Sequence, residues 1–160
     1  ILGTYATSFY AGADTSFIAS LNYNKTEFDG DVDALFNAED QFDFENGTPK
    51  WRGAFTVTHA FGPFSVLGRA NYYGKYENSD SGGAAGLIQE FDPVVMFDVE
   101  GSWQATDAVK LSVGARNIFD EYPDEADPAI GDSCCGRIYR SDSEVDWQGG
   151  FYYAKVTAEF

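Results

Sequence analysis

A short run of alternating carboxylates is the clearest candidate for a metal site in this sequence. Asp29, Asp31 and Asp33 are separated by single residues, and carboxylate oxygens at this spacing suit a hard cation such as Ca²⁺. The complete twelve-residue calcium loop with its terminal Glu is missing. We therefore keep these three residues as a candidate calcium site and expect no other cofactor. The alternative is a solvated acidic loop.

A second group of candidate residues lies between positions 134 and 147. Cys134 and Cys135 are adjacent, and in an oxidising compartment such thiols form a vicinal disulfide or bridges to cysteines elsewhere. A zinc site would need two further ligands that this segment does not offer. Aromatic and basic side chains follow, and together they could contact an anionic or sugar-like ligand. These candidate ligand-binding residues are Arg137, Tyr139, Arg140 and Trp147. Ordinary packing within the loop is the alternative for each.

Catalytic chemistry finds little support in the sequence. A Ser/His/Asp site would need His59, the only histidine, and the alternation described below places it on an apolar face. Neither a Gly-rich phosphate loop nor a zinc-ligand spacing is present. Asp98 and Glu100 share one face of a predicted strand, but ion pairs with Arg69 and Arg116 on that face explain them more simply. We expect no enzymatic activity.

Charge is distributed unevenly along the chain. Residues 29–48, 77–92 and 118–148 hold 20 of the 26 acidic residues but only two of the ten basic ones. These segments lack sustained periodicity and are rich in Gly, Ser and Asn, so we expect long loops. The formal net charge of −16 would repel a phosphate backbone, and we expect no nucleic-acid partner. A run of about 18 apolar residues, which a transmembrane helix needs, is also missing.

Between these loops, apolar residues recur at every second position, which is typical of β-strands. One face of residues 64–76 collects Phe64, Val66 and Tyr72, whereas the other is mostly polar. Seven strands are predicted in this way, at residues 1–10, 15–25, 51–61, 64–76, 94–104, 109–116 and 151–160. Short turns and long acidic loops alternate between them. An antiparallel up-and-down sheet therefore places the short turns at one end and the acidic loops at the other.

The apolar face has features of a transmembrane barrel rather than of a soluble sandwich. The strands span about 10 residues or slightly more, which is near the length that a tilted strand needs to cross a bilayer. Small residues on this face would fill a protein core poorly, and aromatic residues gather near the strand ends, as at membrane interfaces. We expect lipid against this face and a lumen on the other. The residues expected to face the lumen are Arg52, Arg69, Lys75, Glu100, Arg116 and Lys155.

Two segments resemble TonB-dependent outer-membrane receptors. Residues 109–123, VKLSVGARNIFDEYP, are similar to the penultimate strand of that family, which ends in an Asn-aliphatic-Phe-Asp motif followed by a Tyr-Pro loop. Residues 149–160, GGFYYAKVTAEF, resemble the last strand, whose terminal aromatic residue is recognised by the barrel assembly machinery. Phe160 takes that place here. The stretches NGTPKWR at 46–52 and FDP at 91–93 are similar to further recurrent elements.

The resemblance implies both an architecture and a function. Receptors of this family close about 22 strands around a plug domain, and they import scarce ligands with energy delivered by the TonB complex. Residues 1–160 would be the C-terminal part of such a barrel, in the outer membrane of a Gram-negative bacterium. The ligand classes allowed are saccharides, peptides and ferric siderophores.

The same resemblance implies a set of partners. These are the remaining barrel strands and the plug domain, the TonB complex reached through an N-terminal region outside this chain, the lipid and lipopolysaccharide of the outer membrane, and the barrel assembly machinery. A passive porin-like or adhesin-type barrel is the first alternative. A soluble β-sandwich carbohydrate-binding module is the second, and in it the aromatic residues would form a core and a sugar platform.

Overall fold

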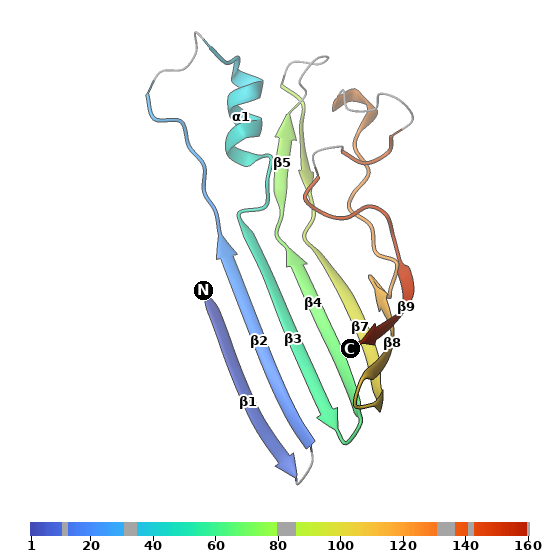
Figure 1. The fold of residues 1–160 in the computed structure, drawn as a ribbon. Coiled ribbons are helices and arrows are strands. Elements are labelled where there is room, and N and C mark those ends of the chain that lie inside the picture. The colour runs from blue at the N-terminus through green and yellow to red at the C-terminus, as the bar shows by residue number, and fades with distance from the viewer. Residues whose placement is uncertain (11–12, 31–34, 80–85, 131–136, 141–142, 160) are drawn as a thin grey trace.

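One antiparallel sheet dominates the computed structural model, which describes residues 1–10, 13–30, 35–79, 86–130, 137–140 and 143–159 (Figure 1). In spatial order its strands are β1 (Leu2–Tyr10), β2 (Ala13–Tyr23), β3 (Trp51–Phe61), β4 (Phe64–Tyr73), β7 (Val94–Thr106), β8 (Val109–Arg116) and β9 (Phe151–Ala158). Each strand pairs with the next one in this series, so the predicted all-β antiparallel meander is confirmed. Among the described residues, β1 and β9 form the two unpaired edges of the sheet.

The turn between β3 and β4 shows how the sequence sets the strand register. Gly62 has a φ of +55°, a left-handed conformation that costs glycine little. Pro63 follows it, and its missing N–H group is tolerated because it lies in the turn. Phe61 then pairs directly with Phe64, and the two strands continue in register to the pair Arg52 and Tyr73.

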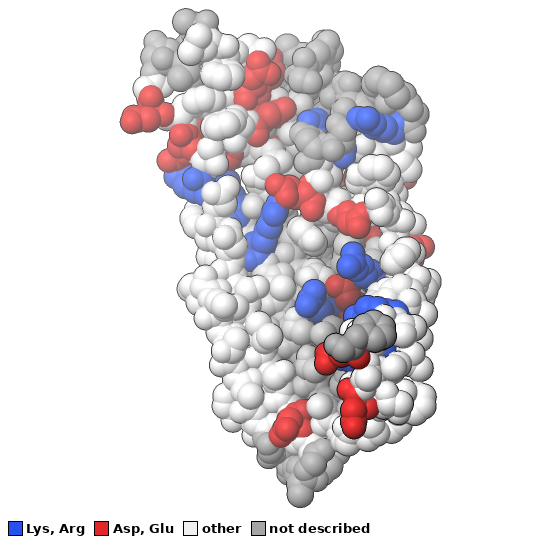
Figure 2. Space-filling view, viewed as in Figure 1, with Lys and Arg blue, Asp and Glu red and all other residues white. Residues whose placement is uncertain are grey.

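All three long connections lie at one end of the sheet and the short turns lie at the other, as predicted (Figure 1). We call residues 24–50 the first connection, residues 74–93 the second and residues 117–150 the third. On the face turned to the viewer in Figure 2, acidic side chains lie over these connections with some basic ones among them, and further basic and acidic side chains lie over the sheet. Much of the negative charge therefore belongs to one end of the molecule.

The first connection contains a helix where the sequence predicted only loop. Helix α1 (Ala38–Asn46) begins after Asn37, whose side chain accepts a hydrogen bond from the Asp40 backbone N–H at 2.7 Å. Glu39 and Asp40 in the first turn favour the positive end of the helix dipole. None of the helical residues is buried, so α1 lacks the apolar stripe that periodicity detects. No helix within the described ranges is both long and apolar enough to cross a membrane.

The second connection is also more regular than predicted. Strand β4 ends at Tyr73 instead of continuing to Tyr76, and the chain resumes as β5 (Tyr76–Ser79) and β6 (Ile88–Phe91), which form a two-stranded sheet. Gly74 marks the break. Its backbone N–H donates to the Trp51 carbonyl oxygen at 2.8 Å, and a Cβ at this position would lie 2.9 Å from that oxygen. The close contact between the backbones of Gly74 and Trp51 therefore lies where the main sheet ends and the small sheet begins.

The most deeply buried large side chains lie in this small hairpin rather than in the main sheet. The rings of Tyr76 and Phe91 stack at 4.6 Å with an interplanar angle of 4°, and Phe91 is only 1% exposed. Asn78 is buried beside them. Aromatic stacking together with apolar burial thus supplies a local core for the long connections.

Hydrogen bonds join the three connections to one another. The Ser79 N–H donates to Asp43 Oδ1 of α1 at 2.6 Å, which links the second connection to the first. The Gln89 side chain donates to the Glu125 carbonyl oxygen at 2.8 Å and accepts from the Asp127 N–H at 2.8 Å, which links the second to the third. The third also contains a short 3₁₀-helix, η1 (Pro128–Ile130). The described connections therefore form one packed layer.

Candidate functional site

The apolar face of the main sheet is exposed from one edge strand to the other. Phe55 is 48% exposed, Val66 51% and Val113 65%, although all three lie well inside the sheet. Tyr5 on β1 and Val156 on β9 extend the same exposed face to both edges. Neither α1 nor the small hairpin contacts the main strands extensively, so no described helix or strand covers this face, and Phe119 of the third connection contacts it at the ring of Phe97. An apolar surface of this extent marks an interaction surface.

Aromatic rings border this face at both ends. Near the short turns, the ring centroids of Phe61 and Phe64 are 5.8 Å apart, and those of Phe64 and Trp103 are 6.4 Å apart. Near the long connections, the rings of Tyr23 and Trp51 lie 4.7 Å apart. Small and aliphatic side chains occupy the band between these two groups, together with the stacked rings of Tyr5, Phe17 and Phe55. Aromatic residues at the strand ends were predicted, and Phe61, Phe64, Trp103 and Trp51 agree with that prediction; Tyr76, predicted for the border near the long connections, is buried in the small hairpin instead.

His59 lies within the apolar face, as its position in the alternation predicted. Its Nδ1 atom is 2.8 Å from the Thr15 hydroxyl on the neighbouring strand, and Thr15 is buried. The imidazole also lies 5.6 Å from the ring of Phe61. One polar atom of the ring is therefore satisfied between β2 and β3.

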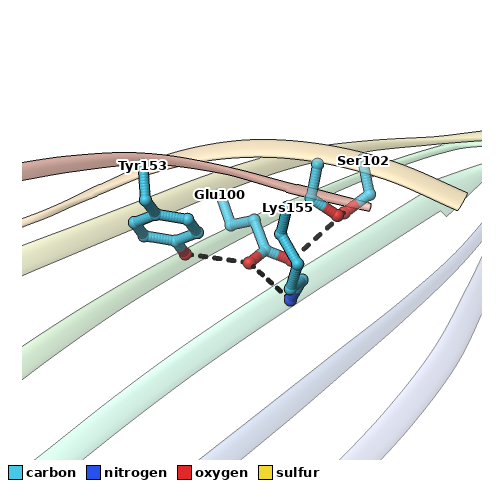
Figure 3. Close-up of polar contacts among 5 residues, drawn as sticks. Glu100, Ser102, Tyr153 and Lys155 are labelled. Carbon is cyan, nitrogen blue, oxygen red and sulfur yellow. Dashed lines mark hydrogen bonds and ion pairs between the residues drawn. The ribbon is translucent and has the colours of Figure 1, made fainter. Parts of the chain in front are cut away.

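The polar face carries a hydrogen-bonded network centred on Glu100 of β7 (Figure 3). Tyr153 Oη donates to Glu100 Oε2 at 2.8 Å, and Lys155 Nζ donates to the same oxygen at 3.1 Å. Ser102 Oγ donates to Oε1 at 3.1 Å and lies 2.8 Å from Ser112 Oγ. The network therefore ties β7 to β9 across the intervening strand β8.

Gly114 on β8 allows this crossing. It pairs with Glu100 on one side and with Tyr153 on the other. A Cβ at Gly114 would lie 2.6 Å from both Cζ and Oη of Tyr153 and 2.7 Å from the Val99 carbonyl oxygen. The absence of a side chain therefore lets the tyrosine ring lie against the backbone and reach Glu100.

Asp98 lies two residues from Glu100, toward the long connections, and two nitrogen donors occupy its carboxylate. Asn71 Nδ2 donates to Oδ2 at 2.9 Å, and the Asn117 backbone N–H donates to Oδ1 at 3.0 Å. The predicted ion pairs of Asp98 with Arg69 and Arg116 are therefore wrong for the described structure. Although Arg69 is the cross-strand neighbour of Asp98, its Nε donates to the hydroxyl of Thr56 at 3.0 Å instead.

The predicted ion pairs of Glu100 with Arg69 and Arg116 are also wrong for the described residues. Glu100 forms its ion pair with Lys155 of β9, and neither Arg69 nor Arg116 forms an ion pair with any described residue. Lys155 shares the polar face, and its neighbour on the intervening strand β8 is the small residue Ser112. The choice of partner thus depends on side-chain reach and not only on a shared face.

The motif at residues 117–123 fastens the third connection to the sheet. Asn117 has a φ of +47° and Asp120 a φ of +59°. The Asn117 side chain accepts from the Glu121 N–H at 3.0 Å and donates to the Glu121 carbonyl oxygen at 2.7 Å. Asp120 Oδ1 accepts from the Gly150 N–H at 2.7 Å and from the Tyr122 hydroxyl at 3.1 Å. These bonds hold both ends of the connection together beside β8 and β9.

The four residues predicted to contact a ligand have different surroundings. Tyr139 stacks on Tyr122 at 5.8 Å with an interplanar angle of 11°, and Arg140 is only 7% exposed. Arg137 is exposed and Trp147 is 49% exposed. Tyr139 and Arg140 are therefore packed within the connection, whereas Arg137 and Trp147 are open to a ligand. Their binding role stays a prediction.

Several predicted residues lie outside the described part of the chain, namely Asp31, Asp33, Cys134, Cys135 and Phe160. Asp29 is described and is exposed. Within the described ranges, no group of three or more His, Cys, Asp or Glu side chains could hold a metal ion. The calcium site, the disulfide and the terminal assembly signal therefore stay predictions.

Two of the residues predicted to face a lumen lie near the long connections. Arg52 forms an ion pair with Glu144 of the third connection, and its guanidinium carbon lies 6.0 Å from the centre of the Tyr73 ring. Lys75 lies in the break between β4 and β5, and its Nζ donates to Glu90 at 2.6 Å. Both cations therefore help to join the connections to the end of the sheet.

The pair of Lys75 and Glu90 predicts a pH dependence. The hydrogen bond from Lys75, followed by the attraction of its charge, lowers the pKa of the Glu90 carboxyl and raises the pKa of Lys75. Because the folded-state pKa of Glu90 is lowered, its contribution to stability is complete above the unfolded-state pKa. The contribution is lost as the pH falls through the folded-state pKa.

We expect an NMR titration of the Glu90 carboxyl carbon to show a midpoint below that of an unperturbed glutamate. Lys75→Met should raise this midpoint, because the hydrogen bond and the charge are both removed. Lys110→Met is the control, since Lys110 lies near the short turns at the other end of the sheet. Identical Glu90 midpoints in the unaltered protein and in Lys75→Met would contradict the pairing.

A pocket of about 530 Å³ opens on the polar face beside the third connection. Arg69 and Arg116, both predicted to face a lumen, line it together with Asp146, Gln148 and Phe151. Asp146 and Phe151 were not among the residues predicted to contact a ligand, whereas Gln148 directly follows the predicted residue Trp147. Their position just before and at the start of β9 was an available signal, since Arg116 ends the neighbouring strand at the same end of the sheet.

No protein-family model, curated protein or solved structure matches this chain. A proposal for the function therefore rests on three observations, which are the exposed apolar face, the hydrogen-bonded network on the polar face and the pocket.

Proposed function

We propose that this chain forms part of the wall of an outer-membrane β-barrel receptor that takes up a nutrient ligand in a TonB-dependent manner. The observation that carries the proposal is the apolar face, which is exposed from β1 to β9. In water such a face is an extended apolar patch, which soluble monomers rarely present. Against lipid, apolar side chains leave water at a gain of roughly 25 cal/mol per Å² of area removed.

The dimensions and the polarity of the sheet support this environment. The main strands have 8 to 13 residues, and a tilted strand needs about 9 to 11 to cross a bilayer. Charged residues such as Glu100 and Lys155 lie on the face opposite the apolar one, where a hydrated lumen tolerates them. A soluble sandwich would instead require a second layer over Phe55 and Val113.

The two edge strands define what else the proposal requires. Unpaired backbone groups along β1 and β9 are not tolerated in hydrocarbon, where water cannot satisfy them. Further strands must therefore pair with both edges, supplied by the same polypeptide or by another chain. The receptor assignment, as opposed to another barrel, is supported by the resemblance of residues 109–123 and 149–160 to the family and by the layer of long connections at one end.

Contact with lipid can be tested by tryptophan quenching in the intact protein, purified from membranes with whatever strands complete its sheet. Phe97→Trp places the probe on the apolar face, and Leu67→Trp places it on the polar face, after the native tryptophans are changed to phenylalanine. Lipids brominated along their acyl chains should quench the first probe strongly and the second weakly. Equal quenching, or extraction into buffer without detergent, would contradict the proposal.

A receptor and a passive pore differ in conductance. A barrel that contains a plug should leave a planar bilayer nearly non-conducting in KCl, whereas an open porin-like barrel conducts. Steady large conductance would therefore favour the passive alternative.

A further inference from the structure

Two arginines in the polar-face pocket form no ion pair with any described residue. Arg69 of β4 and Arg116 of β8 both line the pocket and are exposed. The Arg69 side chain uses only its Nε atom, on Thr56, and no hydrogen bond within the described residues reaches the guanidinium group of Arg116. Because guanidinium groups pair readily with carboxylates, two such groups without a partner in a chain of net charge −16 require an explanation.

The carboxylates of the same pocket form no ion pair with these arginines. Both oxygens of Asp98 already accept hydrogen bonds, from Asn71 and from the Asn117 N–H. Asp146 uses Oδ1 to accept from the Gln148 N–H at 2.9 Å, and no described group bonds to its other oxygen. The pocket therefore presents two guanidinium donors and one carboxylate oxygen that can accept from a ligand.

Aromatic side chains complete the lining. Phe151 at the start of β9 is exposed and stacks at 6.3 Å on Tyr153, and Tyr73 lines the pocket from β4. A ring face contacts the apolar C–H surface of a bound molecule, while a tyrosine hydroxyl adds a polar group. The pocket volume of about 530 Å³ lies within the usual range for small-molecule sites, about 300 to 1,000 Å³.

We propose that this pocket binds a small hydroxylated carboxylate of the size of a sugar acid, such as D-glucuronate. The ligand carboxylate pairs with Arg69 and Arg116, its hydroxyl groups donate to Asp146 and accept from Gln148, and its ring lies near Phe151. The inference rests on the proposed function, because the ligand reaches this pocket through the lumen of the barrel, and it specifies the class of that ligand. Such pairing is the geometry for which a guanidinium is best suited.

The charges around the pocket favour this ligand over inorganic phosphate and over ligands with several negative charges. Asp98 and Asp146 would repel phosphate groups, and the acidic connections above the sheet add to that field. The two arginines balance Asp98 and Asp146 in formal charge, so a single carboxylate is held by charge-assisted hydrogen bonds to the guanidinium N–H groups and not by a net positive charge, while hydroxyl groups give Asp146 the donor that inorganic phosphate supplies poorly. A ligand with one negative charge and several hydroxyl groups therefore matches the pocket.

Calorimetric titration of the intact protein, purified in detergent, tests the inference with matched probes. D-Glucuronate and D-glucose differ only by a carboxylate in place of a hydroxymethyl group. We expect D-glucuronate to bind and D-glucose to bind at least tenfold more weakly. Arg69→Gln and Arg116→Gln should each weaken D-glucuronate binding by about 10-fold to 100-fold, since each removes a charged hydrogen-bonding partner.

Lys110→Gln is the matched control. Lys110 is on β8 like Arg116, on the same face, and six residues away, which is about 20 Å along a strand. It does not line the pocket, so its loss should leave binding unchanged. Each variant is first shown to keep the circular dichroism and unfolding midpoint of the unaltered protein. Equal binding of D-glucose, tight binding of inorganic phosphate, no binding of D-glucuronate, or an equal loss in Lys110→Gln would overturn the inference.

The lipid-quenching measurement on the same preparations separates this inference from the proposed function. D-Glucuronate binding without quenching of a tryptophan at position 97 would contradict the barrel and leave the pocket in place. Quenching without D-glucuronate binding would contradict the ligand assignment alone.

Discussion

Val66→Arg should destabilise the protein in a lipid bilayer strongly, because an arginine on the lipid face of a barrel costs about 2–4 kcal/mol near the midplane and less toward the interfaces. Val66 is half exposed on the apolar face of β4, between the aromatic border at Phe64 and the middle of the strand, so the lower end of this range applies. We therefore expect a loss of about 2 kcal/mol in the free energy of unfolding. Urea unfolding in phospholipid vesicles, followed by tryptophan fluorescence, measures it.

Leu67→Arg provides the control one residue away. Leu67 lies on the polar face, and its cross-strand partner is Glu100, so an arginine there gains a nearby carboxylate. This variant should unfold at nearly the same urea concentration as the unaltered protein. If water rather than lipid covered the apolar face, Val66→Arg would change stability by only about 0.5 kcal/mol or less, as at other exposed sites. Similar midpoints for both variants would therefore reject a lipid-facing surface.

Gly114→Ala should destabilise the sheet by about 1–3 kcal/mol, the usual cost of forcing an extra methyl group into a packed site. The new Cβ would overlap Tyr153 and would press against the Val99 carbonyl oxygen, which belongs to the backbone and cannot move alone. Tyr153 must then leave Glu100, and the hydrogen bond that ties β9 to β7 is lost. The urea unfolding midpoint and the ultraviolet absorption of the tyrosine report these two effects.

Gly101→Ala is the matched substitution on the neighbouring strand β7. A Cβ at Gly101 meets no atom within 4 Å, so the same change is accommodated without displacement. Both substitutions reduce the freedom of the unfolded chain to the same degree, and the comparison removes that contribution. Should Gly114→Ala prove as stable as Gly101→Ala, the packing of Tyr153 over Gly114 would be refuted.

The strands of the main sheet were predictable because their alternation is long and their turns carry strong signals. Gly62 and Pro63 mark the turn between β3 and β4, and the predicted boundaries of β3 agree with the structure. Helix α1 was not predictable in the same way, because its residues are unburied and its signal lies in the Asn37 cap. The small hairpin of β5 and β6 is too short for its period to stand out from the acidic loop around it.

At the candidate site, the sequence predicted which charged residues share the polar face but not which of them pair. Arg69 and Asp98 are cross-strand neighbours, yet Asn71 and the Asn117 backbone satisfy the carboxylate first. Asn117 directly follows Arg116, the last residue of β8, and its backbone N–H still faces the neighbouring strand β7, where it reaches Asp98. Alternation determines the face of each side chain, whereas pairing depends on local backbone geometry that no periodic pattern records.

The two-residue turn at Gly62 and Pro63 has a consequence for how the chain tolerates insertions and deletions. The sheet is a single layer with different environments on its two faces. Adding one residue within β4 would therefore move every side chain that follows in that strand to the opposite face. Arg69 and Asn71 would then occupy the apolar side. An extra residue in the exposed stretch after Tyr23 shifts no such pairing. Natural length variation should therefore be confined to the connections, and the strands should keep constant length.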